Sequence, residues 1–121
     1  MIEVVLPWPV SLSPNRARTM PMASRTGHEH DDRAIGRQAV LAQLSPLPNF
    51  PAGDIPLTIT AYPPYARHLD ALSLHYILKA QLDGVADALG VDDWRFWPVR
   101  LERANPMAGG QVRLRFSTDG L

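Results

Sequence analysis

The chain has 121 residues, and its twelve basic and twelve acidic side chains give a formal net charge of +0. This length supports a single domain, and the absence of cysteine excludes both a disulfide framework and a thiolate zinc site. The chain begins Met-Ile-Glu and soon meets proline, which is atypical of a secretory leader. No window approaches the roughly 18 consecutive apolar residues of a membrane span, so we expect a soluble, cytoplasmic protein.

The first third of the chain predicts one strand, one loop and one helix. Residues 2–6 form a β-branched run that ends at Pro-Trp-Pro, which indicates a strand. Residues 16–31 mix Arg and His with Met, Pro, Ser and Gly without any period, so we predict a mobile loop there. A helix with Asp31 or Asp32 as its N-cap should follow and end at Leu44, before Ser-Pro.

The strongest pattern is an amphipathic helix within residues 67–93. Its apolar side chains recur at steps of four and three and form one stripe about 100° wide; they are Leu74, Leu78, Leu82, Val85 and Leu89. Gly90 is placed to end the helix. Lys79 and Asp83 lie outside the stripe at a spacing that allows an ion pair.

Three more segments alternate between apolar and polar residues and predict strands. They cover residues 55–62, 96–101 and 111–116, and a loop containing Gly-Gly joins the last two. Residues 118–121 should fray. We therefore predict a single α+β domain over residues 1–121, a small mixed β-sheet with two helices packed on it in the order β-α-β-α-β-β.

Charge is unevenly distributed although the total is zero. Residues 1–48 sum to +1, residues 49–93 to −4 and residues 94–121 to +3. Carboxylates that hold a divalent ion, flanked by Arg that contacts phosphates, would produce this pattern. An ordinary solvated helix face would produce it too, and charge alone leaves both interpretations open.

Four segments resemble the motifs of one nuclease family. The first lies in residues 6–16, where Leu-Pro-Trp-Pro followed by Ser-Pro-Asn-Arg is similar to the first strand of the family and its Pro-rich turn into an Asn-Arg loop. Arg-His-Leu-Asp-Ala-Leu (67–72) stands where the family has a basic run and Asp-x-Asp-Asn-Leu. Lys-Ala-Gln-Leu-Asp-Gly (79–84) and Val-Asp-Asp (91–93) resemble its Lys-x-x-x-Asp-x-Leu and the paired aspartates after the helix. In this order the motifs resemble the RusA-type Holliday junction resolvases.

The resemblance implies a small phage or prophage endonuclease that resolves four-way junctions in DNA recombination and repair. It would act in the bacterial host cytoplasm as a homodimer, since a junction has two-fold symmetry and needs two nicks. The cofactor would be Mg²⁺, with Mn²⁺ as a substitute, held by Asp70, Asp92 and Asp93. The catalytic residues would be Asp70, Lys79 and Asp93, with Lys79 near the scissile phosphate. Branched DNA would contact Asn15, Arg16, Arg18, Arg67 and Lys79.

One family motif is incomplete, because the pair of aspartates in Asp-x-Asp-Asn is reduced to Asp70. If Asp70 is the first of the pair, Leu72 replaces the second; if it is the second, His68 occupies the first position. Counting back from the helix lysine instead places Ser73 and His75 there, and imidazole suits Mg²⁺ poorly. We favour Asp70, although a straight helix would separate it from that lysine by about 13 Å.

Two other groups of residues admit a functional and a structural interpretation. Trp8, Trp94 and Trp97 could stack on bases, but in a small domain we predict that they lie in the core or a dimer interface. The segment from His28 to Asp32 has a metal-like composition, and we interpret it as loop plus N-cap.

Two alternatives to a nuclease remain open. A relative that has lost the second aspartate could bind DNA without cleaving it. A small phage-type interaction protein without nucleic-acid activity could use its acidic helix to dock a partner.

Overall fold

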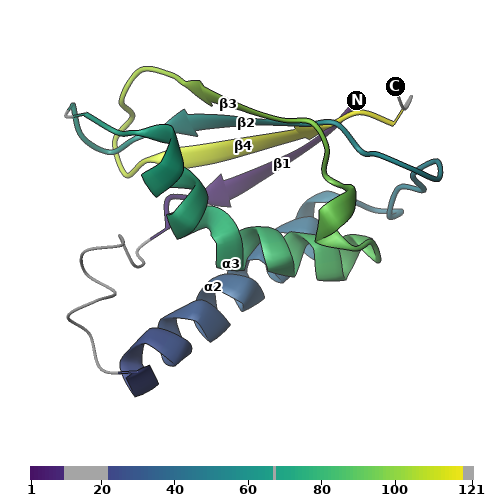
Figure 1. Ribbon diagram of the computed structural model, residues 1–121, viewed down its shortest axis with the longest axis horizontal. Coiled ribbons are helices and arrows are strands. Elements are labelled where there is room, and N and C mark those ends of the chain that lie inside the picture. Colours follow the sequence, from purple (N-terminus) through teal and green to yellow (C-terminus); the bar gives the residue numbers. More distant parts are fainter. Residues whose placement is uncertain (10–21, 67, 119–121) are drawn as a thin grey trace.

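Two helices lie on the same face of a four-stranded mixed sheet in the computed structural model, which describes residues 1–9, 22–66 and 68–118 (Figure 1). The elements are β1 (Ile2–Pro7), α2 (Met22–Gln43), β2 (Leu57–Tyr62), α3 (Ala71–Leu89), the 3₁₀ turn η1 (Asp93–Arg95), β3 (Val99–Arg103) and β4 (Gln111–Phe116). The predicted α+β class and the order β-α-β-α-β-β are confirmed. Within the described ranges, no helix has the length and apolar character needed to cross a bilayer.

The sheet has the order β1-β4-β2-β3, with β4 antiparallel to β1 and β2, and β2 parallel to β3. Alternate residues of β4 point into the core, where Val112, Leu114 and Phe116 are fully buried. The four predicted strands are therefore confirmed, with ends that shift by a few residues. The Gly-Gly loop does not close a hairpin, because β2 lies between β3 and β4.

Helix α2 begins at Met22, well before the N-cap predicted at Asp31 or Asp32. Residues 22–31 of the predicted loop are thus helical, while 16–21 and the frayed tail beyond 118 lie outside the described residues. Asp32 is an interior helix residue with only 5% of its surface exposed. Helix α2 as a whole packs against α3, and tertiary packing of this kind commonly overrides helix propensity.

The two helices approach so closely that their backbones touch. A Cβ on Gly36 would lie 2.0 Å from the carbonyl oxygen of Gln81, and one on Gly84 would lie 1.9 Å from that of Arg33. Beside this crossing, the Arg33 guanidinium donates two hydrogen bonds to the Asp87 carboxylate, at 2.7 and 3.0 Å. Glycine is therefore required at both crossing positions.

Helix α3 presents its predicted apolar stripe to the sheet, and all five side chains of the stripe are buried. Asp70 caps its N-terminus, and Gly90 ends it in the left-handed conformation with φ 71°. The helix thus runs without a break from Asp70 past the lysine and fixes the direction in which each polar side chain projects.

The outer edge of β1 is covered by a side chain rather than by a strand. The amide of Gln43, at the end of α2, accepts a hydrogen bond from Val5 N–H (2.8 Å) and donates one to Val5 C=O (2.7 Å). It thereby satisfies the two backbone groups of Val5 that an adjacent strand would use.

Candidate functional site

Lys79 on α3 holds two carboxylates that come from different elements. Its Nζ donates to Asp83 Oδ1 at 2.6 Å and to Asp93 Oδ2 at 2.5 Å. Asp83 is one helical turn further along α3, whereas Asp93 opens η1 after the chain has turned at Gly90. Since both oxygens contact one nitrogen, they lie at most about 5 Å apart. The predicted pairing of Lys79 with Asp83 is confirmed.

The charges of this cluster stabilise one another. The hydrogen bond from Lys79 lowers the pKa of Asp93, against a smaller opposing effect of burial. Burial acts to lower the pKa of Lys79, but its hydrogen bonds to Asp83 and Asp93 outweigh burial and raise that pKa. One ammonium thus faces two carboxylates, and the local charge is negative.

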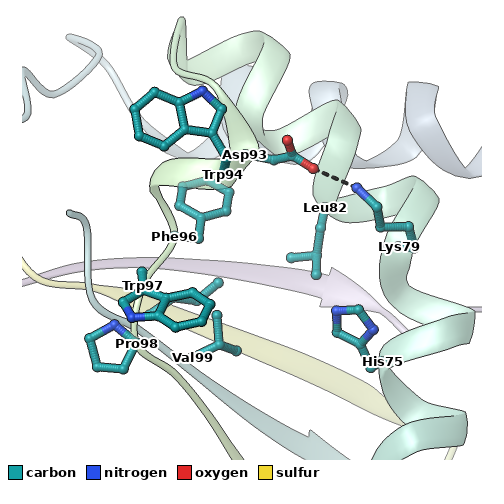
Figure 2. Close-up of a pocket in the computed structure, with 10 residues that line it drawn as sticks. His75, Lys79, Leu82, Asp93, Trp94, Phe96, Trp97, Pro98 and Val99 are labelled. Atoms are coloured by element: carbon teal, nitrogen blue, oxygen red, sulfur yellow. Dashed lines mark hydrogen bonds and ion pairs between the residues drawn. The ribbon is translucent and has the colours of Figure 1, made fainter. Parts of the chain in front are cut away.

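A cavity of about 580 Å³ opens beside Lys79, between α3 and the segment that leads into β3 (Figure 2). Most of its wall is apolar or aromatic, and three polar side chains converge on it, namely His75, Lys79 and Asp93. The apolar and aromatic lining residues are Leu57, Leu82, Trp94, Phe96, Trp97, Pro98 and Val99. A largely apolar hollow with a few convergent polar groups is typical of a ligand site.

Asp70 lies apart from this cluster. Both of its carboxylate oxygens cap α3, with Oδ1 accepting from Ser73 N–H (2.8 Å) and Oδ2 from Ser73 Oγ (3.0 Å). These hydrogen bonds lower the pKa of Asp70. Asp70 lines a separate cavity beside the end of β3, which shares no lining residue with the cavity at Lys79. The structure therefore brings Lys79 and Asp93 together, with His75 on the same wall, but not Asp70.

The other predicted site residues divide into exposed and undescribed ones. Asp92 is exposed at the start of η1, makes no capping hydrogen bond and does not line the cavity. Arg67 and the proposed DNA contacts in the N-terminal loop, namely Asn15, Arg16 and Arg18, lie outside the described residues.

Two of the three tryptophans are not in the core. Trp94 and Trp97 are 70% and 66% exposed, and the buried aromatic of their segment is Phe96, whose ring centroid lies 5.3 Å from that of Phe116. Trp8 does pack partly against the core and meets Tyr65 edge-on. A place in the core is therefore wrong for Trp94 and Trp97, because the apolar position of this short segment is already filled by phenylalanine; the alternative, a place in a dimer interface, stays a prediction.

Sequence reasoning missed the acidic groups that α2 brings to the far side of Lys79. A smaller cavity of about 240 Å³ is lined there by Glu29, Asp32, Asp83 and Lys79, together with apolar and aromatic residues of α3. The helix that carries Glu29 and Asp32 starts at Met22, and a predicted start there would have placed both residues on a helix. Within the described ranges, no three His, Cys, Asp or Glu side chains are grouped to hold a metal ion. This finding includes the segment from His28 to Asp32, so far as the structure describes it.

No known family model matches this sequence, and comparison with curated proteins finds no significant match. The resemblance to the RusA-type resolvases thus stays a prediction.

Proposed function

We propose that the protein is a Mg²⁺-dependent endonuclease that nicks branched DNA, four-way junctions included, with its active centre at Lys79, Asp83 and Asp93. The observation that carries this proposal is the contact of one lysine with two carboxylates beside an open cavity. The same lysine and both aspartates belong to the segments that resemble the resolvase motifs.

The donor set fits a magnesium ion that completes its coordination with water and substrate. Proteins usually hold Mg²⁺ with one or two carboxylates, several waters and substrate phosphates. Asp83 and Asp93 supply two carboxylates whose nearest oxygens are at most about 5 Å apart, and each keeps a second oxygen that Lys79 does not engage. When bound there, Mg²⁺ or Mn²⁺ would lower the pKa of an attacking water and offset charge on the phosphate.

The remaining groups have clear tasks in this proposal. Lys79 balances the two carboxylates, and its half-exposed side chain can swing to donate to a non-bridging phosphate oxygen. His75, one turn before Lys79, lines the same cavity and offers an imidazole for proton transfer. A homodimer would place two such centres on the two strands of a junction.

A second candidate is a protein that binds branched DNA without cutting it. It is favoured by the engagement of both Asp70 oxygens in hydrogen bonds to Ser73, which occupy a carboxylate that the resemblance assigns to the metal. Its phosphate contacts would make binding strongly salt-dependent.

One assay distinguishes these functions. The purified protein is incubated with a synthetic four-way junction or linear duplex, in Mg²⁺, Mn²⁺ or EDTA. Metal-dependent nicks that are lost in Asp93→Asn and kept in Asp92→Asn, the matched exposed neighbour, would support the enzyme. A salt-sensitive mobility shift without nicks would support the binder. Absence of any shift at low salt would overturn both.

A further inference from the structure

Two large aromatic side chains face solvent on the short segment between α3 and β3. Trp94 and Trp97 remain mostly exposed, although tryptophan is highly buried on average. Both line the cavity beside Lys79. Exposed aromatic surface of this kind is typical of an interaction site rather than of an isolated domain surface.

The segment that carries the tryptophans is fastened to the domain. The Arg95 guanidinium donates to backbone carbonyls of the loop at 51–53, and Phe96 is buried against Phe116. The backbone N–H of Trp97 donates to the backbone carbonyl of Ile55, just before β2, at 3.1 Å. The indole rings are therefore held outward by a fixed backbone, which lowers the entropic cost of binding a flat ligand.

The cavity has the size and chemistry for a nucleobase. Its volume of about 580 Å³ lies within the range of small-molecule sites. Trp97 and His75 stand on opposite sides in the close-up, and Leu82 projects from α3 above them (Figure 2). An aromatic face suits a base, and the hydrogen-bonded pair Lys79 and Asp93 on the same cavity wall marks where the phosphate of that base would lie.

We propose that this cavity takes up an unpaired nucleobase of single-stranded or branched DNA, stacked on Trp97. The inference deepens the proposed function and rests on it, because a base seated there would bring its own phosphate to Lys79, Asp83 and Asp93. Stacking accepts any base, since each has a π face. The base is uncharged and tolerates the local negative charge, whereas its phosphate does not, so Mg²⁺ should strengthen binding.

The test compares two short single-stranded oligodeoxynucleotides of equal length, one with bases and one abasic. Affinity is measured by fluorescence anisotropy at fixed salt and Mg²⁺, and quenching of tryptophan fluorescence reports contact with the rings. Trp97→Leu should weaken binding of the base-containing strand about tenfold or more and leave the abasic strand unchanged. Trp97→Phe should keep most of the affinity. Leu41→Ala, which alters an exposed apolar residue of α2 outside the cavity, should change neither.

Each other outcome gives a definite answer. If Trp97→Leu lowers the affinity for both oligodeoxynucleotides equally, or for neither, the stacking inference is overturned. It is also overturned if Trp97→Leu changes only the sedimentation of the free protein, because that result indicates a second copy over the cavity. Junction nicking by a protein without base-dependent binding would leave the proposed enzyme intact and remove the stacking. Base-dependent binding without nicking in Mg²⁺ or Mn²⁺ would remove the proposed enzyme and leave the stacking intact.

Discussion

Substitution of Gly36 by alanine tests the close contact between the helices. The added Cβ would lie 2.0 Å from the Gln81 carbonyl oxygen, 2.9 Å from its carbon and 3.1 Å from the Val85 nitrogen. All three atoms belong to the α3 backbone, so no side-chain rotation can relieve the clash. The helices would have to move apart by more than 1 Å to restore the ordinary contact distance of at least 3.4 Å.

The expected loss of stability follows from two opposed effects. Overpacking a well-packed interface costs about 1–3 kcal/mol, and a backbone clash belongs at the upper end. Replacing glycine by alanine inside a helix gains about 1 kcal/mol. We therefore expect the free energy of unfolding to fall by about 2 kcal/mol and the melting temperature by about 8 °C.

Urea unfolding monitored by circular dichroism measures this change. The exposed Gln38 on the same helix supplies the control, since Gln38→Ala should be about 1 kcal/mol more stable than Gln38→Gly through helix propensity alone. At position 36 the change from glycine to alanine must instead lower the free energy of unfolding. A Gly36→Ala protein as stable as the wild type, or more stable, would show that the helices do not touch at this position.

Three further predictions concern contacts away from this crossing. Asp70→Ala should lower the melting temperature, and Asp70→Ser, which keeps a capping oxygen, should largely restore it in thermal unfolding. Gln43→Leu should accelerate amide hydrogen exchange at Val5, because that N–H loses its acceptor, and unchanged exchange would contradict the edge contact. Arg33 lowers the pKa of Asp87, so this carboxylate stabilises the fold above its unfolded pKa of about 3.9 and loses that effect as the pH falls through its folded pKa. Wild type should therefore exceed Asp87→Asn in urea stability at pH 7 and approach it near pH 3.

The fold could be predicted from sequence where the pattern is strong and not where packing alone decides. Helix α3 has a complete apolar stripe and a terminal glycine, and both predictions are confirmed. Helix α2 has no comparable stripe near its start, and its close contact with α3 further along uses Gly36 rather than large side chains. Its first turns were consequently mistaken for loop.

In the candidate site, too, sequence patterns predicted some of the contacts, and packing decided the others. The i, i+4 spacing predicted that Lys79 meets Asp83, and the paired-aspartate motif marked Asp93, which the structure brings to the same nitrogen. Asp70 was predicted as a metal ligand and is found as the cap of α3, since an aspartate before a helix serves equally in either role. The exposure of Trp97 was also hidden, because composition cannot tell which aromatic of a segment fills the core.

The amide of Gln43 has a consequence for how this sheet can grow. It closes the β1 side at Val5, while among the described strands the opposite margin, β3, has no strand beyond it. Two copies that joined through β3 would present to solvent two β1 margins, each interrupted at Val5 by the Gln43 amide. A further strand could not pair with β1 through Val5, and the amide thus disfavours the continued addition that would build a fibre.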